Sequence, residues 1–166
     1  MKISYKRKAI IKIKAIISKI VLFFLYRGFK AGYKLDTRIK KEIDSWQNGF
    51  SAVIETGEKN TKLCITKENG KLVRKKQINN ADIVITFKSI DVAFLMFTGR
   101  LGVAKAYAEH RFTLKGEINQ TMSLVRVIDL VEAYLFPKFI TKNILKEVPK
   151  KEANMLRTYI CVITNI

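Results

Sequence analysis

Few residues in this sequence are of the types that carry catalysis or hold metals. The chain has one histidine, His110, and two cysteines, Cys64 and Cys161, which are far apart in the sequence. A nucleophile needs a base within hydrogen-bond reach, and a zinc site needs several Cys or His ligands at short spacings. Neither pattern is present. We interpret His110 as a turn or surface residue, and the cysteines as small buried hydrophobic side chains in a reducing compartment.

The acidic residues of the second half form no acid–base pair and no metal-ligand set. They are Asp91, Glu109, Glu117, Asp129 and Glu132. We expect them to cap helices or to offset nearby lysines. Residues 99–102, Gly-Arg-Leu-Gly, lack the Gly-Lys-Ser/Thr ending with which a phosphate loop binds its anion. The sequence therefore predicts a protein that is not an enzyme and that needs no cofactor and no metal.

Charge is the strongest feature of the composition. The chain has 166 residues, 48% of them hydrophobic, with 32 Lys and Arg against 14 Asp and Glu, a net charge of +18 and a pI near 10.0. Ten of the cations lie in residues 1–35, which hold no acid. This excess points to an anionic partner, either a phospholipid surface or a nucleic acid.

The first 35 residues have the pattern of a basic amphipathic helix. Apolar side chains recur at intervals of three and four residues, which places them on one face. They are Ile10, Ile13, Ile17, Ile20 and Phe24. The opposite face carries Lys8, Lys12, Lys19 and Lys30. The longest apolar run, residues 20–26, has seven residues, far fewer than the roughly 20 needed to cross a bilayer.

We therefore expect this helix to lie on an anionic membrane, with its lysines against the headgroups and its apolar face in the acyl boundary. The predicted docking residues are Lys8, Lys12, Lys19, Ile13, Ile17, Ile20 and Phe24. Two alternatives remain, a first helix packed on the domain and a short membrane anchor. Nucleic acid is the less favoured partner, because it would use only the lysine face and no platform of exposed aromatic residues accompanies it. The expected location is cytoplasmic and peripheral at the membrane.

After residue 36 the pattern becomes alternating, which predicts β-strands. The expected strands span about 38–47, 50–57, 61–67, 71–78 and 83–88. Asn48-Gly49 and Asn69-Gly70 are typical of two-residue hairpin turns, because both central positions of such a turn need positive φ. The first hairpin pairs Ile43 with Ile54, and the second pairs the residues that flank its turn. Together the segments predict a largely antiparallel sheet of five or six strands.

The second half returns to helical spacing. Ser89 is positioned to cap a helix that continues to about residue 101, and a short helix follows at about 103–109. Residues 111–115 alternate again and predict a strand. A long helix then has apolar positions at intervals of four and three, and Pro137 closes it.

These patterns divide the chain into a basic helical segment, residues 1–35, a single domain, residues 36–148, and a tail, residues 149–166. The tail ends with an apolar run, residues 159–163, that should not remain exposed. It can add an edge strand, cover an opening in the domain or contact a partner, and the sequence leaves these alternatives open.

Residues 81 to about 130 contain an ordered series of segments: Ala81-Asp82-Ile83-Val84-Ile85-Thr86-Phe87, Ser89-Ile90-Asp91-Val92-Ala93-Phe94-Leu95-Met96, Thr98-Gly99-Arg100-Leu101, Lys105-Ala106-Tyr107 and Phe112-Thr113-Leu114-Lys115-Gly116-Glu117. In order and spacing this series resembles the sterol carrier protein 2 (SCP2-like) family. These match that family's Asp-led strand, short helix, Gly-x-Leu turn, second short helix and strand that ends in Gly and an acid. Three residues depart from the pattern: Ala81 replaces a common Pro, His110 a common Gly and Glu117 a common Asp. We expect His110 to adopt a left-handed backbone at modest strain.

The resemblance implies an α+β fold in which helices cover one face of the sheet and leave an apolar tunnel between the two layers. It implies a lipid ligand in the tunnel, namely a sterol, a fatty acid or acyl-CoA, or a phospholipid, and no catalytic residues. The residues expected to line the tunnel are Ile85, Phe87, Phe94, Phe97, Leu101, Phe112, Leu114, Met122 and Val125. An aromatic stripe of this kind also forms ordinary core. The alternative function is therefore a scaffold or accessory subunit of a lipid-modifying complex, with a solid core.

Overall fold

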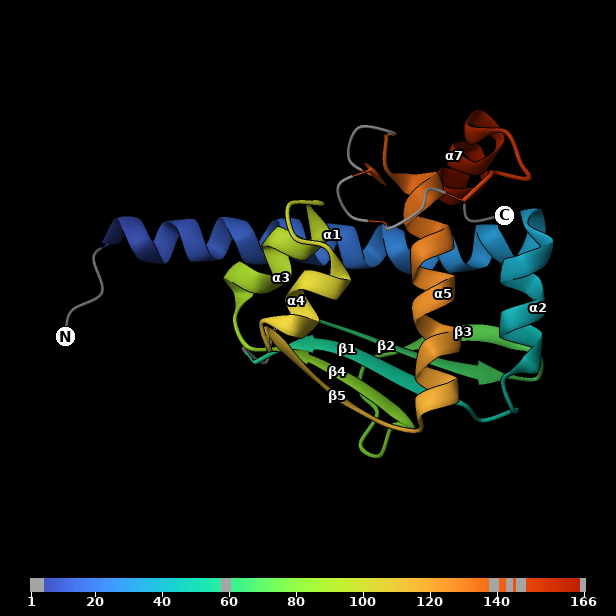
Figure 1. Ribbon diagram of the computed structural model, residues 1–166, viewed down its shortest axis with the longest axis horizontal. Helices are drawn as coiled ribbons and strands as arrows, with labels where there is room; N and C mark the ends of the chain where they lie inside the picture. Colours follow the sequence, from blue (N-terminus) through green and yellow to red (C-terminus); the bar gives the residue numbers. More distant parts are fainter. Residues whose placement is uncertain (1–4, 58–60, 138–140, 143–144, 146–148, 165–166) are drawn as a thin grey trace.

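The computed structural model describes residues 5–57, 61–137, 141–142, 145 and 149–164. Its elements are α1 (Tyr5–Leu35), α2 (Thr37–Ser45), β1 (Ser51–Thr56), β2 (Lys62–Glu68), β3 (Lys71–Lys75), β4 (Ile83–Phe87), α3 (Ile90–Phe97), α4 (Val103–Ala108), β5 (Phe112–Lys115), α5 (Ile118–Leu135) and α7 (Met155–Thr164). They form two layers, a β-sheet and a set of helices over one of its faces, with the long helix α1 extending beyond the domain at its N-terminal end (Figure 1).

The sheet has five strands in the order β3-β2-β1-β4-β5. The pairs β1–β2, β2–β3 and β4–β5 are antiparallel, and β1 and β4 are parallel. Parallel neighbours cannot be joined by a tight turn, so the chain must cross over the sheet between β3 and β4. The expected α+β fold, with a largely antiparallel sheet of five or six strands and helices over one face, is confirmed (Figure 1).

The hairpin predicted at Asn69-Gly70 is also confirmed. These two residues have φ angles of 49° and 73°, the positive values that a type I′ turn needs. The flanking residues Glu68 and Lys71 pair across the ladder. The turn is correct because its geometry depends only on residues that are adjacent in the chain.

Local signals also located the helices of the second half. Ser89 caps α3 by accepting a hydrogen bond from the backbone N–H of Val92 at 3.3 Å. Helix α5 ends at Leu135, two residues before Pro137. His110, between α4 and β5, has a φ of 50°, the left-handed conformation expected from the sequence.

The predicted first strand, residues 38–47, is wrong, because this segment forms helix α2. Asp36 caps the helix by accepting hydrogen bonds from the backbone N–H groups two and three residues later, at 3.0 and 3.4 Å. Ile39 and Ile43, four residues apart, are both buried on one face of the helix. The predicted pair of Ile43 with Ile54 therefore does not form, and Ile54 pairs with residues of β2 and β4.

A side chain of the sheet completes the C-terminal end of α2. The ammonium group of Lys67, on β2, donates hydrogen bonds to the backbone carbonyls of Ile43, Asp44 and Trp46, at 2.9, 3.0 and 2.6 Å. The last carbonyls of a helix lack partners within the helix and favour a cation. The residue that stabilises this helix end thus comes from a distant part of the sequence.

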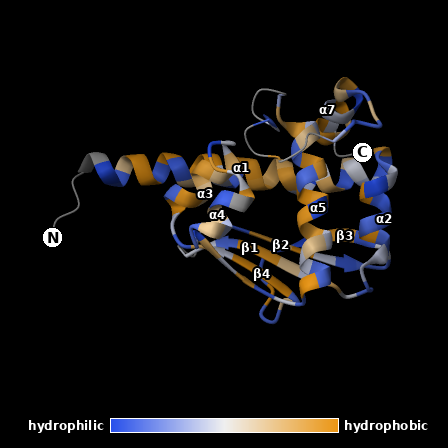
Figure 2. Ribbon diagram, in the orientation of Figure 1, coloured by the Kyte–Doolittle hydropathy of each residue, from blue (hydrophilic) through white to orange (hydrophobic). Residues whose placement is uncertain are grey.

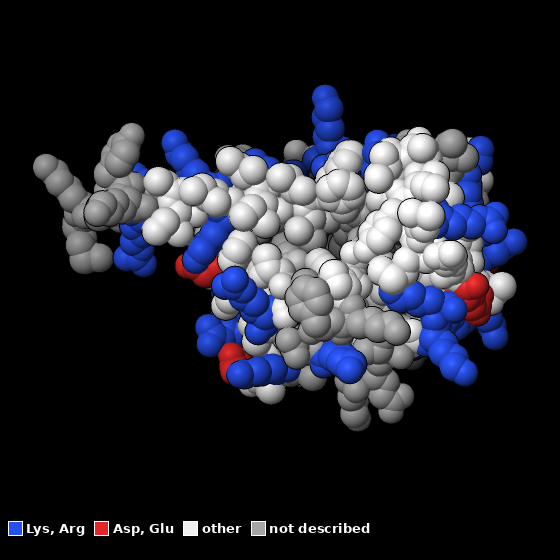
Figure 3. All heavy atoms as spheres, turned by 90° about the horizontal axis from the view of Figure 1, so that it is seen from above, with Lys and Arg blue, Asp and Glu red and all other residues white. Residues whose placement is uncertain are grey.

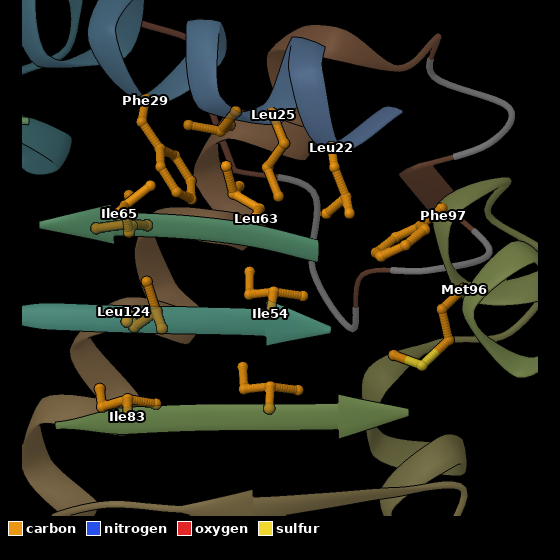
Figure 4. Packing of buried hydrophobic residues seen from close by; sticks show 14 of the residues in the cluster. Leu22, Leu25, Phe29, Ile54, Leu63, Ile65, Ile83, Met96, Phe97 and Leu124 are labelled. Atoms are coloured by element: carbon orange, nitrogen blue, oxygen red, sulfur yellow. The ribbon is translucent and has the colours of Figure 1, made fainter. Parts of the chain in front are cut away.

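The core lies between the sheet and the helices, and the C-terminal half of α1 fills its centre. Leu22, Leu25 and Phe29 are 1%, 5% and 0% exposed. Figure 4 shows these side chains directed from α1 towards the sheet, close to Leu63 and Ile65 of β2. Full burial of each such side chain contributes about 1.5–3 kcal/mol. This half of α1 is therefore an integral part of the core.

The tail forms helix α7, which contacts α1 and α5, so the alternative of an added edge strand is wrong. Figure 2 shows that α1 carries hydrophobic residues along its length, also where it extends beyond the domain. Among the described residues, no helix combines the length and the apolar content that crossing a bilayer requires.

Candidate functional site

Five of the nine predicted lining residues gather at one end of the core. They are Ile85, Phe87, Phe97, Leu101 and Phe112, each at most 9% exposed. The ring centroid of Phe87 lies 5.3 Å from that of Phe97 and 5.9 Å from that of Phe112, both edge to face. Strands β4 and β5 and helix α3 thus build an aromatic cluster at this end of the apolar layer.

The other four predicted lining residues are less buried. Phe94, Leu114 and Val125 are half-buried, and Met122 is 51% exposed on the surface of α5. The fully buried side of α5 carries Leu124, Val127 and Val131 instead. The predicted set therefore falls into a buried cluster at the α3 end of the core and an exposed part on α5.

The centre of the apolar layer is occupied by side chains that the sequence analysis assigned to no site. Leu22, Leu25 and Phe29 of α1 cover the middle of the sheet, where the expected tunnel would continue (Figure 4). A hollow of about 330 Å³ lies at the sheet edge and is lined by Lys62, Arg74, Lys75 and Lys76. Its cationic lining suits an anion and not a lipid tail.

The predicted docking residues lie between residues 8 and 24 of α1, a stretch that begins where the helix extends beyond the domain and continues over the domain itself (Figure 1). Ile13, Ile20 and Phe24 are 56%, 49% and 39% exposed, and Ile17 is half-buried. Lys8, Lys12 and Lys19 are exposed beside them. Ile16 and Phe23, which were not among the predicted residues, are 56% and 38% exposed. We name the exposed apolar residues of this helix the α1 stripe: Ile10, Ile13, Ile16, Ile20, Phe23 and Phe24.

The α1 stripe points away from the sheet. At 100° per residue, Ile13, Ile16 and Ile20 fall on the side of the helix opposite Leu22, Leu25 and Phe29, which face the sheet. Viewed from the helix side, α1 presents uncharged atoms with Lys and Arg around them (Figure 3). The stripe is thus an apolar surface with a cationic border.

One ion pair connects this half of α1 to α3. The Nζ atom of Lys14 lies 2.5 Å from Oδ1 of Asp91 and 5.6 Å from the ring centroid of Phe94. The two charged side chains are 29% and 57% exposed, so the pair contributes at most about 1 kcal/mol. Ser18, one turn further, is buried.

A buried network fixes the corner between α1 and α2. Asp36 accepts hydrogen bonds from Nη2 of Arg38 at 2.6 Å and from the hydroxyl of Tyr134 at 2.7 Å. Burial acts to raise the pKa of Asp36, but these hydrogen bonds outweigh it and the pKa lies below its ordinary value. The Tyr134 hydroxyl also accepts from the backbone N–H of Glu152 at 2.8 Å. The network therefore ties the segment before α7 to α5 and α1.

Two acids of α5 neither cap a helix nor offset a lysine among the described residues, contrary to expectation. Burial raises the pKa of Asp129 to about 6, and burial together with the charge of Asp129 raises the pKa of Glu132 to about 8. Glu117 does cap α5, and Asp91 and Glu109 form ion pairs. In the part of the chain that the structure describes, no three His, Cys, Asp or Glu side chains are grouped to hold a metal ion.

No protein-family model matches the sequence, and neither does any curated protein. Among solved structures, the chain is similar to a UbiJ-SCP2 ubiquinone synthesis protein, with 18% identity over 72% of this chain and 96% of that one, and a TM-score of 0.44. It is similar to sterol carrier protein 2 from Yarrowia lipolytica in its apo form, with 14% identity over 68% and 89%, and a TM-score of 0.46. A sterol carrier protein 2 like 2 from Aedes aegypti has 15% identity over 58% and 95%, and a TM-score of 0.36. At these identities the likeness concerns the SCP2-like fold alone.

Proposed function

We propose that this chain is a non-catalytic lipid-binding protein that is peripheral at an anionic membrane. It docks through the α1 stripe and takes the tail of a lipid, a sterol, a fatty-acyl chain or a phospholipid, into the aromatic end of its apolar layer. The protein transfers lipid by exchanging it between the bilayer and this apolar layer.

The observation that carries the proposal is the α1 stripe. Six large apolar side chains, each between 38% and 56% exposed, follow one face of a helix whose 31 residues include no acid. Exposed apolar side chains gathered on one face mark an interaction surface. The lysines beside them select a partner with negative charge, and a bilayer offers both an apolar interior and anionic headgroups.

The lipid tail is assigned to the cluster around Phe87, because the remainder of the layer is occupied by α1. Tyr107, 65% exposed, lies against Phe112 with 6.0 Å between ring centroids, so the cluster reaches the surface at α4. An apolar tail entering there would meet aromatic rings without displacing Leu25 or Phe29 from the centre of the sheet.

Vesicle binding tests the docking step. Wild type and the double variant Ile13→Gln/Ile20→Gln are sedimented with vesicles of phosphatidylcholine and phosphatidylglycerol at a ratio of three to one. Each substitution removes an aliphatic side chain worth about 1 kcal/mol in the bilayer, so the double variant should bind at least about tenfold more weakly. Binding by wild type should also fall with added salt and in pure phosphatidylcholine.

Ile118→Gln is the matched control. Ile118 is 73% exposed, and Figure 1 shows that α5 begins near the strands, away from α1. This variant should bind vesicles as wild type does. Equal binding by wild type and the Ile13→Gln/Ile20→Gln variant would reject α1 as the docking element.

A second candidate, a membrane-bound scaffold that holds no lipid, is favoured by the filling of the sheet centre with Leu22, Leu25 and Phe29. Native mass spectrometry separates the two functions. The protein is incubated with vesicles that contain palmitic acid and cholesterol, recovered, and sprayed intact. A retained lipid adduct supports lipid binding, and the absence of any adduct with docking intact assigns the scaffold function.

A further inference from the structure

Helix α7 has an exposed apolar face that the packing of the domain does not use. Leu156, Ile160 and Ile163 are spaced by four and three residues, on one side of the helix, and are 67%, 52% and 67% exposed. The opposite side carries Thr158 and Val162, which are 3% and 1% exposed against the domain. Helix α7 is therefore apolar on both sides, and only one side is covered by the chain itself.

Arg27 connects this face to the α1 stripe. Its Nη1 atom donates hydrogen bonds to the backbone carbonyls of Val162 and Ile163, at 3.0 and 2.7 Å, at the C-terminal end of α7. The same guanidinium lies over the ring of Phe23, 4.6 Å from its centroid. Arg27 thus contacts both Phe23 of the stripe and the backbone of α7 at Ile163, and so brings the two exposed apolar sets close together.

The two sets also point the same way. Helix α7 lies over the side of α1 that faces away from the sheet (Figure 1), and the helix contacts α1 and α5. Its exposed face therefore points away from the sheet, as the α1 stripe does. A single flat partner can meet both.

The charge of this surface favours an anionic bilayer over a second copy of the chain as its partner. Residues 5–35 and 155–164 contain ten Lys and Arg and no Asp or Glu, so every acid of the chain lies outside α1 and α7. A second copy of this chain would bring two such basic surfaces together, and like charges repel. An anionic bilayer is attracted by the same charges, and Figure 3 shows the Lys and Arg side chains at the border where headgroups would lie.

We infer that α7 is the second half of the membrane-contact surface, with Leu156, Ile160 and Ile163 entering the acyl boundary of an anionic bilayer beside the α1 stripe. This inference rests on the proposed function, since it extends the docking step from one helix to two. The contact with both helices lays α1 along the membrane and turns the sheet towards the solvent.

The experiment compares three variants with wild type on vesicles of phosphatidylcholine and phosphatidylglycerol at three to one. The α7 variant is Leu156→Gln/Ile160→Gln, the α1 variant is Ile13→Gln/Ile20→Gln, and the control is Ile118→Gln. No substitution changes the net charge, so differences report the apolar contact. We expect the α7 variant to bind about tenfold more weakly than wild type, and the control to be unchanged.

Weaker binding by both the α7 and the α1 variants supports the two-helix surface. Wild-type binding by the α7 variant with weak binding by the α1 variant overturns the inference, leaves the proposed docking intact and assigns the α7 face to an acidic protein. Wild-type binding by all three variants overturns both the inference and the docking step.

A second measurement covers the case in which the double variant does not fold. Ile163→Gln changes a single side chain that is 67% exposed, and its circular dichroism and thermal unfolding are compared with those of wild type. A folded Ile163→Gln protein should bind the vesicles about threefold more weakly. Unchanged binding by this folded variant also overturns the inference.

Discussion

The two halves of α1 are both apolar on one side but differ in how deeply their apolar side chains are buried. The C-terminal half is fixed in the core: Phe29 is 0% exposed, and an ideal Cβ at Gly28 would lie 2.5 Å from Cγ1 of Val131. The N-terminal half pairs with α3 through Lys14 and Asp91 and has Ile17 half-buried, while its other side, including Ile16 at 56%, remains exposed. Both halves are rich in apolar residues, so apolar content alone does not decide what is buried. An apolar side chain of α1 is buried where a complementary surface of the domain lies opposite it.

Along this single helix, stability and the proposed docking should depend on different side chains. The buried side chains, such as Phe29, should determine the free energy of unfolding with little effect on vesicle binding. The side chains of the α1 stripe should do the reverse.

The largest effect is expected from a pair of identical substitutions. Phe29→Ala removes a fully buried ring and should lower the free energy of unfolding by about 3–5 kcal/mol. Phe24→Ala, on the same helix but 39% exposed, should change it by at most about 0.5 kcal/mol. Urea unfolding followed by circular dichroism measures both. Similar losses from the two variants would contradict the division of α1 into a packed face and an exposed face.

The close contact of α1 with α5 offers the next test. Gly28→Ala adds a methyl group against Val131 and should cost about 1–3 kcal/mol through overpacking. Val131→Ala opens space at that position, so the double variant should be more stable than the sum of the two single effects predicts. Additive effects in this double-mutant cycle would show that the two residues do not press on each other.

Glu132 lies next to Val131 on α5, in the same packed region. Its ionisation should make the free energy of unfolding depend on pH. Its pKa is raised by burial to about 8 from an ordinary value of 4.5, so the folded chain holds a proton that the unfolded chain releases between these values. Stability should therefore fall as the pH rises from about 5 to about 8, and the raised pKa of Asp129 adds to the fall.

Thermal unfolding of Glu132→Gln at pH 5 and pH 8 measures this contribution. The variant should lose less stability over the range than wild type, because it has no proton to release there. Parallel curves for the two proteins would show that Glu132 is ionised in the folded chain.

The smallest effect is expected in the N-terminal half. Lys14→Ala removes the exposed ion pair with Asp91 and should lower stability by less than about 1 kcal/mol, and by less still at high salt. Asp91→Ala should give the same small change. A loss of several kcal/mol from either would mean that the N-terminal half of α1 is part of the core after all.

Features with local causes could be predicted from the sequence. The turn at Asn69-Gly70 requires positive φ at two adjacent positions, and the caps at Ser89 and Glu117 depend on residues within one helical turn. The aromatic cluster was also predicted in part, because Phe87, Phe97 and Phe112 lie in a segment with regular apolar spacing.

Features with distant causes could not be predicted. Residues 38–47 form a helix in place of the predicted strand. Its cap by Asp36 is a local signal that the prediction overlooked, whereas the hydrogen bonds from Lys67 to its last carbonyls come from 21 to 24 positions away in the sequence. The parallel pairing of β1 and β4 depends on a crossover and not on a turn. The apolar face of α1 was predicted without the neighbouring face of α7, because Arg27 joins residues that are 135 and 136 positions apart.

The sequence by itself determined the periodicities, the turn, several caps and the separation of charge that leaves α1 and α7 without acids. Each of these depends on residue type and on short spacing along the chain. Only the tertiary structure decided which side of α1 faces the sheet, because a helix with apolar residues on more than one side buries the side that finds a matching surface. The sheet buries one side of α1, which carries Leu22, Leu25 and Phe29. The α1 stripe, on the other side, stays exposed.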